Sequence, residues 1–236
     1  MTSVLELNHT STYFAEVSTE WRKVSGGLKQ ISVGSAAHIW GVNAKDEIFR
    51  YTHENNWQNI SGGLKQVSVA ADGTVFGVNA SDEIFRYLGN NNWRKISGGL
   101  KQISVGSAAH IWGVNAKDEI FRYTHENDWQ NISGSLKHVA VAADGTVFGV
   151  NASDEIFRYL GNNNWRKISG GLKQISVGSA AHIWGVNANN EIFRYTHEND
   201  WQNISGGLKH VAVAADGTVF GVNAGDEIFR LVEKLV

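Results

Sequence analysis

The feature that most constrains this chain is a near-exact internal repeat. A tryptophan recurs every 36 residues, and the text between successive tryptophans repeats almost letter for letter. The match is closer still at 72 residues, so pairs of units have been triplicated. The repeated tryptophans are Trp21, Trp57, Trp93, Trp129, Trp165 and Trp201. Six units, each too short to bury a core alone, predict an architecture in which neighbouring units pack against one another.

Each unit predicts four short β-strands. Residues 29–33, 39–43, 47–51 and 57–61 alternate in polarity and are rich in β-branched and aromatic side chains. No 3.6-residue period accompanies them, which excludes helical solenoids. Turn-forming residues separate the runs, and we expect tight reversals at Gly62-Gly63, at Asp72-Gly73 and over 43–46.

These units are expected to close into a ring. An open β-solenoid would need polar capping repeats, which this chain lacks, whereas radial closure leaves only short protected edges. The last unit ends after its third strand, near 227–232, while a spare fourth strand over 21–25 opens the chain. We therefore predict an all-β, six-bladed β-propeller of four-stranded antiparallel blades, with the N-terminal strand completing the last blade.

A single domain is expected over residues 1–236, with repeats starting at 21, 57, 93, 129, 165 and 201. Residues 1–20 lie outside the repeat, although 5–9 and 12–17 have some strand character. The beginning of the chain lacks the features of a signal peptide, and cysteine is absent, so we expect a cytoplasmic protein.

Charge and hydropathy exclude two classes of partner. Lys and Arg total 21 against 23 Asp and Glu, and the two signs alternate along the chain, so no basic face is predicted to bind nucleic acid. No segment is apolar enough to insert into a membrane.

Catalysis is not expected, because general acid and base groups need different environments and the repeat supplies equal ones. The segment AADGTVF does not match the S-x-D-x-G-x-T-W box of sialidase-like propellers. No cofactor or metal is expected either. His53, His125 and His197 recur beside Glu54, Glu126 and Glu198 at an outer turn, too far apart to share an ion. His138 and His210 replace Gln66 in only two of six units.

Four side chains recur in every unit and suit sugar binding. An indole can receive the apolar C–H face of a sugar, while carboxylate, guanidinium and amide groups bind hydroxyls. We expect the clefts between neighbouring blades to bring these groups together. The candidate ligand-binding residues are Trp21, Asn43, Glu47, Arg50, Trp57, Asn79, Glu83, Arg86, Trp93, Asn115, Glu119, Arg122, Trp129, Asn151, Glu155, Arg158, Trp165, Asn187, Glu191, Arg194, Trp201, Asn223, Glu227 and Arg230.

A purely structural role is the alternative for each of them. The repeated tryptophan is also suited to packing, Arg50 to an inter-blade ion pair with Asp46 or Glu47, and Asn43 to turn formation. The tryptophans confined to odd units, Trp40, Trp112 and Trp184, replace Phe76, Phe148 and Phe220 and are expected in the core.

The strings ISGGLKQISVG, HIWGVNAKDEIFRY and DGTVFGVNASDEIFRY resemble the repeats of the tectonin family. The resemblance covers residues 21 to 236, and the six-repeat count is especially similar to that of fungal tectonin lectins. It implies a sugar-binding propeller that recognises O-methylated glycans, methylated mannose or fucose among them, on microbial or nematode surfaces in defence. Two departures could make the sites inequivalent: Leu231 stands where Tyr51 is expected, and Asn190 where Asp46 is.

Two other functions remain open at this point. A scaffold propeller would bind a protein on one face, but scaffolds usually diversify their loops, and these loops are as repetitive as the strands. A consensus propeller without a ligand would show similar internal identity. Repetition favours many equal weak sites that combine through avidity. The sequence also leaves open whether the chain assembles with further copies of itself.

Overall fold

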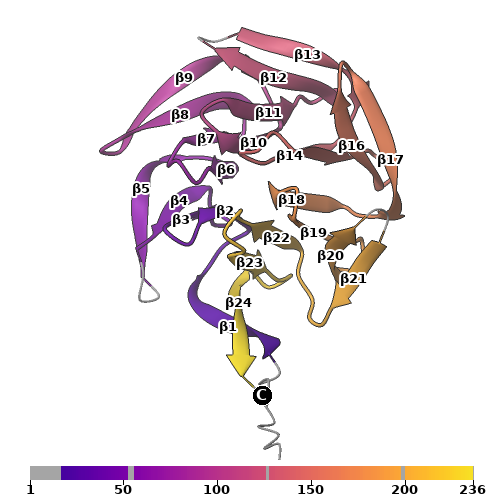
Figure 1. Ribbon diagram of the computed structural model, residues 1–236. Coiled ribbons are helices and arrows are strands. Elements are labelled where there is room, and N and C mark those ends of the chain that lie inside the picture. Colours follow the sequence, from indigo (N-terminus) through magenta and orange to yellow (C-terminus); the bar gives the residue numbers. More distant parts are fainter. Residues whose placement is uncertain (1–16, 53–55, 126–127, 198–199, 236) are drawn as a thin grey trace, which may run out of the picture.

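The computed structural model describes residues 17–52, 56–125, 128–197 and 200–235. These residues form 24 strands in six four-stranded antiparallel sheets, arranged as blades around a central axis (Figure 1). The predicted six-bladed β-propeller is confirmed. Among the described residues no helix is long and apolar enough to cross a membrane. The expected strand character of 5–9 and the outer-turn residues His53, Glu54, Glu126 and Glu198 lie outside the described residues.

The first three blades follow the chain from the axis outward. Blade I contains β2 (Gln30–Ser35), β3 (His38–Val42), β4 (Glu47–Tyr51) and β5 (Trp57–Gly63). Blade II contains β6 (Gln66–Val69), β7 (Val75–Val78), β8 (Glu83–Gly89) and β9 (Asn92–Gly99). Blade III contains β10 (Gln102–Ser107), β11 (His110–Val114), β12 (Glu119–His125) and β13 (Asp128–Ser135).

The remaining blades repeat this order, and the last one recruits the first strand of the chain. Blade IV contains β14 (His138–Val141), β15 (Val147–Val150), β16 (Glu155–Gly161) and β17 (Asn164–Gly171). Blade V contains β18 (Gln174–Ser179), β19 (His182–Val186), β20 (Ile192–His197) and β21 (Asp200–Ile204). Blade VI contains β22 (His210–Val213), β23 (Val219–Val222), β24 (Glu227–Leu235) and β1 (Val17–Gly27).

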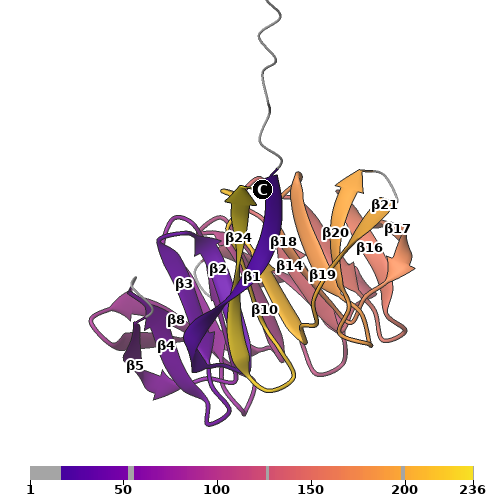
Figure 2. The same cartoon turned by 90° about the horizontal axis from the view of Figure 1, so that it is seen from below.

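The N-terminal strand closes the ring as expected. β1 runs antiparallel to β24, with Trp21 opposite Leu231 and Val24 opposite Ile228 (Figure 2). The strand is longer than the expected 21–25, because its pairing continues back to Val17 opposite Leu235. The ends of the chain therefore supply the pairing that closes the propeller.

One predicted turn is wrong. Gly62-Gly63 does not reverse the chain within a blade but ends β5, where the register passes from Ile60 opposite Ile48 to Gly63 opposite Glu47 through a bulge. Gly62 has φ 124°, a conformation that favours glycine. The expected turn over 43–46 is present, because the Asp46 amide donates to the Asn43 carbonyl at 3.1 Å.

The core lies between the blades. Each hydrophobic cluster combines one face of a blade with the opposing face of the next, as Trp40 and Ile48 of blade I do with Val67 and Val75 of blade II. Trp40, Trp112 and Trp184 are no more than 3% exposed, so the predicted core role of the odd-unit tryptophans is confirmed. A blade therefore reaches full burial only when both neighbours are present.

The innermost strands line a narrow central channel and are joined by side-chain hydrogen bonds. The Gln30 amide donates to the Val67 carbonyl at 2.9 Å and accepts from the Val67 amide at 3.1 Å. Beside it, the Ser32 hydroxyl accepts from the Val69 amide at 3.0 Å. The same three bonds recur at the junctions of the pairs Gln66 and Ser68, Gln102 and Ser104, and Gln174 and Ser176.

Two junctions lack these bonds, because blades IV and VI carry His138 with Ala140 and His210 with Ala212. Nδ1 of each histidine is completely covered and has no hydrogen-bond partner. Each ring keeps some accessible surface toward the channel, but its dense surroundings disfavour the charged form. Burial, with a smaller contribution from Lys137, lowers the pKa of His138 to about 4. Burial, followed by His138, Lys209 and Lys173, lowers the pKa of His210 to about 3.

These pKa values predict acid instability. Because both folded-state pKa values lie below the unfolded value of about 6.5, the unfolded chain binds protons more readily, and stability is lost as pH falls from 6.5 toward 4. Replacing both residues, His138→Gln with His210→Gln, should reduce the loss between pH 7.5 and pH 5 by about 2 to 4 kcal/mol. Urea unfolding at the two pH values measures it. Equal pH dependence in wild type and variant would contradict the assignment.

Candidate functional site

The six repeated tryptophans clamp neighbouring blades together. The Trp57 indole Nε1 donates to the Ser25 carbonyl of blade VI at 2.8 Å. The bond recurs around the ring in Trp93 to Ser61, Trp129 to Ser97, Trp165 to Ser133, Trp201 to Ser169 and Trp21 to Ser205. The packing role weighed for these residues is therefore present at every junction, and their rings remain partly exposed.

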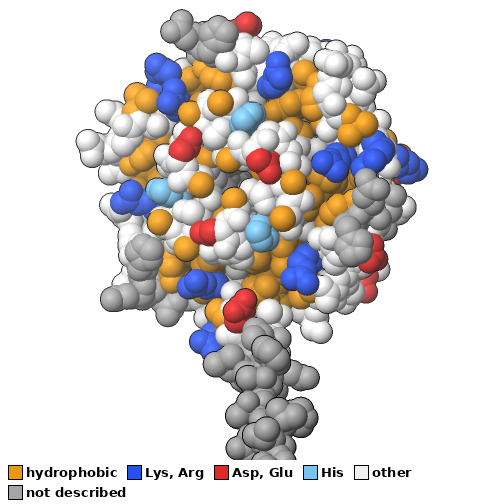
Figure 3. Space-filling model, viewed as in Figure 1, with side chains coloured by type: hydrophobic (Ala, Val, Ile, Leu, Met, Phe, Trp, Pro, Cys, Tyr) orange, Lys and Arg blue, Asp and Glu red, His pale blue; other side chains and the backbone are white. Residues whose placement is uncertain are grey.

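A second set of inter-blade bonds lies at the junctions that lead into odd blades. The Asp72 carboxylate accepts from the Ala108 amide at 2.8 Å. Asp144 and Asp216 bind Ala180 and Ala36 in the same way. Burial opposes ionisation of Asp72, but these backbone hydrogen bonds and nearby His38 together lower its pKa. Acidic and histidine side chains lie around the axis on the face shown in Figure 3.

A cleft opens beside the clamping tryptophan. Between blades VI and I it has a volume of about 240 Å³, between II and III about 220 Å³, and between III and IV about 110 Å³. The first is lined by Gly26, Gly27, Leu28, Asn43, Phe49, Trp57 and Ile228. In the smallest, Ser135 replaces the second glycine and the corresponding Asn151 is not part of the lining. Each of these clefts thus has a wall of aromatic and aliphatic side chains. The two larger clefts also contain the side-chain amide of an asparagine.

Asn43 forms the turn weighed for it and also lies at the cleft. Its side-chain oxygen accepts from the Lys45 amide at 2.9 Å and the Glu47 amide at 3.0 Å, which fixes the turn. Its Nδ2 donates to the Glu47 carboxylate at 2.6 Å. Because Asn43 also lines the cleft, this bond holds the glutamate next to the opening.

The four candidate sugar-binding side chains of one blade do not share one cleft, because they lie on both faces of the blade. Phe49 and Trp57 pack on blade VI, whereas Ile48 packs on blade II. Side chains alternate along a strand, so Arg50 lies on the Ile48 side and faces blade II. The arginine of one blade therefore faces the tryptophan, asparagine and glutamate of the next.

The inter-blade ion pair weighed as an alternative role for Arg50 does not form with Asp46 or Glu47. Arg50 Nη2 donates instead to Gln58 Oε1 at 2.7 Å on the neighbouring strand. Asp46 binds Lys29, and Glu47 binds Asn43. Arg122 and Arg194 make the same bond to Gln130 and Gln202.

In even blades the arginine environment differs. Arg86 lies directly opposite Arg94 across the strands, and its guanidinium sits 5.8 Å over the Phe76 ring. The equivalent arginine pairs are Arg158 with Arg166 and Arg230 with Arg22. Clefts that lead into odd blades therefore carry two arginines on one wall.

The glutamates alternate in the same way. In even blades they form ion pairs with a lysine on the neighbouring strand: Glu83 with Lys95, Glu155 with Lys167 and Glu227 with Lys23. The lysine hydrogen bond is the main reason that the pKa of each of these exposed carboxyls is lowered. Asn59, Asn131 and Asn203 replace the lysine in odd blades, and no cation pairs with Glu47, Glu119 or Glu191 among the described contacts.

The clefts thus fall into two classes. In the arginine-pair class, two arginines lie opposite a glutamate that has no lysine partner; these are the clefts between blades VI and I (VI/I), II and III (II/III), and IV and V (IV/V). In the other class, an arginine–glutamine pair lies opposite a glutamate–lysine pair; these are the clefts I/II, III/IV and V/VI. Sequence reasoning missed Phe49, Gln58 and Lys95, although the period-two pattern and the 72-residue repeat contained the signal. No group of three or more potential metal ligands is found in the described part of the chain.

The clamp depends on a glycine beneath each indole. Gly98 has φ 105°, and a Cβ there would lie 3.3 Å from Trp129, whereas at Gly89, φ 91°, nothing lies within 4 Å. Gly89→Ala should cost about 1 to 3 kcal/mol through backbone strain alone. Gly98→Ala should cost a further 1 to 3 kcal/mol, roughly, by crowding the indole. Denaturant unfolding measures both, and equal losses would show that the indole contact contributes nothing.

Comparison with known proteins agrees with this geometry. A family model described as the tectonin domain matches residues 1–162 and 118–234. Over 50 residues the chain is 40% identical to Tectonin-1 of Physarum polycephalum, a match that covers 21% of this chain and 23% of that protein. The chain thus matches less than a quarter of the length of this relative.

Solved structures share the fold at low identity. A streptogramin B lyase structure is 13% identical with TM-score 0.66, covering 92% of this chain and 98% of that one. The WD40 propeller domain of Doa1 is 10% identical with TM-score 0.67, covering 93% and 97%. XC5397 of Xanthomonas campestris, a gluconolactonase, is 11% identical with TM-score 0.70, covering 93% and 90%. These structures share the propeller fold at low identity, whereas the family model matches the repeats themselves: the chain belongs to the tectonin-domain family.

Proposed function

We propose that this protein is a multivalent lectin that binds glycans in the clefts between its blades and catalyses no reaction. The observation that carries the proposal is the cleft beside Trp57, where an apolar wall lies next to Asn43 and the Glu47 carboxylate. A pyranose has an apolar C–H face and a rim of hydroxyls, which match such a wall and its polar edge. Membership of the tectonin-domain family supports the same function.

O-methylated sugars, including methylated mannose and fucose, are the ligands we propose. An O-methyl group adds apolar surface that Phe49, Leu28 and Ile228 can cover. Burying one methyl contributes about 0.8 kcal/mol, or roughly fourfold in affinity at one site. Preference for the methylated sugar therefore grows when several clefts bind one surface together.

The two classes of cleft set the proposed valence at three. The clefts VI/I and II/III belong to the arginine-pair class, and both are larger than the III/IV cleft of the other class. Their glutamates have no lysine partner, so a carboxylate oxygen is available to a sugar hydroxyl. Three equivalent sites around one axis suit a dense glycan coat on a microbe or nematode, where avidity compensates for weak single sites.

A glycan array tests the proposal. It should include O-methylated mannosides and fucosides beside their unmethylated parents. We expect binding to be confined to a small set of glycans, with the methylated form preferred by about fourfold or more. Silence across the array would overturn the lectin proposal and favour a protein-binding scaffold.

A matched variant tests where the sugar binds. A triple variant gives each odd blade the lysine of the even blades: Asn59→Lys, Asn131→Lys and Asn203→Lys. Each new lysine should form an ion pair with the glutamate of its blade, which is Glu47, Glu119 or Glu191. Calorimetric titration with an O-methylated fucoside should then show fewer sites per chain than the three expected for wild type. The reverse exchange, Lys23→Asn with Lys95→Asn and Lys167→Asn, should not lower the number of sites. Unchanged stoichiometry in the first variant would contradict the assignment to odd-blade clefts.

A further inference from the structure

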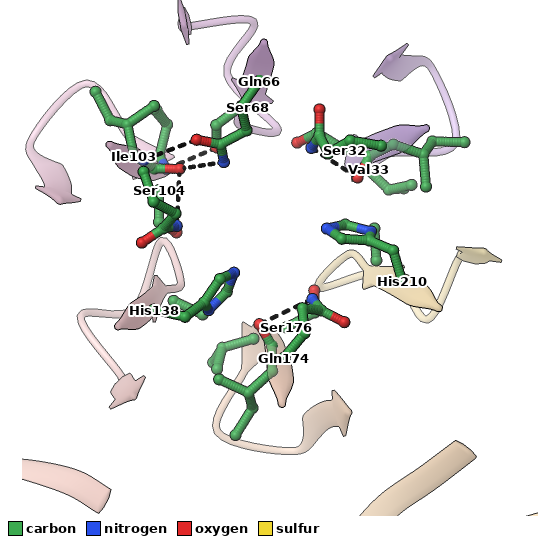
Figure 4. Close-up of a pocket in the computed structure, with 18 of the residues that line it drawn as sticks. Ser32, Val33, Gln66, Ser68, Ile103, Ser104, His138, Gln174, Ser176 and His210 are labelled. Carbon is green, nitrogen blue, oxygen red and sulfur yellow. Dashed lines mark hydrogen bonds between the residues drawn. The ribbon is translucent and has the colours of Figure 1, made fainter. Parts of the chain in front are cut away.

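The central channel holds two histidines that the proposed lectin function does not use. His138 on β14 and His210 on β22 stand on either side of Gln174, and both rings point into the channel (Figure 4). The channel has a volume of about 60 Å³, room for a few water molecules or one small ion. A sugar does not fit there, so the channel is separate from the clefts.

The buried ring nitrogens determine what the histidines present to the channel. Nδ1 of both residues is covered and has no partner. A buried N–H without an acceptor is costlier than a buried lone pair, so the neutral rings carry their proton on Nε2. Both imidazoles therefore offer an N–H donor to the channel.

The other side chains that line the channel also present hydrogen-bond donors to it. Four serine hydroxyl oxygens accept a hydrogen bond from a backbone N–H of the next blade, so each hydroxyl proton can be donated to another group. These serines are Ser32, Ser68, Ser104 and Ser176. No Asp or Glu belongs to the channel lining among the described residues. Such a lining binds an oxygen-rich anion in preference to a cation.

A metal ion fits this geometry poorly. A histidine that ligates a metal through Nε2 normally donates its Nδ1–H to an acceptor. No such acceptor is present at His138 or His210. The two imidazoles are thus arranged as hydrogen-bond donors and not as metal ligands.

The charge near this sector is also unbalanced. A lysine precedes each innermost strand, and five of the six bind an aspartate: Lys29, Lys65, Lys101, Lys137 and Lys209. The sixth, Lys173, binds Asn190 instead. Lys173 lies on blade V, between the blades that carry His138 and His210. Burial lowers the pKa of Lys173, Asp154 raises it, and Lys209 and Lys137 lower it further. Because Asp154 and Asp226 already bind Lys137 and Lys209, this sector has one lysine more than it has bound aspartates, and Lys173 is close enough to His210 to lower its pKa.

We propose that the channel binds a small oxyanion, of the size and charge of phosphate or sulfate, between His138 and His210 with Lys173 supplying the balancing charge. The anion would join the two blade junctions that lack the glutamine and serine bonds. Binding therefore adds stability at the junctions from blade IV to blade V and from blade VI to blade I, where the side-chain bonds are missing.

Phosphate titration of the intact protein tests this proposal. At constant ionic strength, phosphate should shift the imidazole ¹H–¹⁵N resonances of His138 and His210 in a saturable way and raise the melting temperature. Replacing both histidines with glutamine, as at the other four positions, should weaken binding by about tenfold or more for each imidazole. Asn190→Asp, which restores the sixth ion pair, should weaken it less and leave the fold intact.

The contradicting results are equally specific. Phosphate stabilisation of the same size in the double glutamine variant would reveal a general salt effect and overturn the proposal. Histidine resonances that do not saturate would show that the channel holds only water, and would also overturn it. Sulfate and acetate titrations distinguish an inorganic oxyanion from a carboxylate. None of these measurements involves sugar, so failure here leaves the lectin proposal untouched.

Discussion

Burial between blades is the constraint on which the rest of this structure depends. No blade buries both its faces alone, and each hydrophobic cluster draws its residues from two neighbours. The indole Nε1 of each outer tryptophan fixes that contact by donating to a serine carbonyl of the preceding blade. Because the glycine beneath the indole leaves space there, the same contact that closes the ring also creates the cleft. Stability and the proposed binding surface thus arise from one arrangement.

A threefold pattern overlies the sixfold fold, and its effects appear in the polar groups. Odd and even blades share their strand order but exchange Asn59 for Lys95 and Gln58 for Arg94, so alternate clefts differ in charge. Near the axis the pattern is broken further. Blades IV and VI lack the glutamine and serine bonds, and blade V has Asn190 in place of an aspartate. The clefts that lead into odd blades therefore retain threefold symmetry, while the channel concentrates its departures from symmetry in one sector.

Most of the fold was predictable from the sequence, because the 36-residue period, the alternating strands and the spare strand at 21–25 are local patterns. The predicted strand over 47–51 has the observed bounds of β4. The Gly62-Gly63 bulge was not predictable, since glycine pairs suit both hairpins and bulges. The division of Arg50 and Trp57 between two clefts was missed because it depends on which face of the blade each side chain occupies. The unpartnered Nδ1 atoms of His138 and His210 depend on which groups of neighbouring strands lie within hydrogen-bond distance, which no local pattern contains.

The central claim is that sugars bind in the clefts that lead into odd blades. The most direct measurement follows the six indole Nε1–H resonances of Trp21, Trp57, Trp93, Trp129, Trp165 and Trp201 during titration with an O-methylated fucoside. The account predicts saturable shifts at Trp57, Trp129 and Trp201, with smaller changes at the other three. Binding that leaves all six indoles unchanged would place the ligand elsewhere and contradict the account.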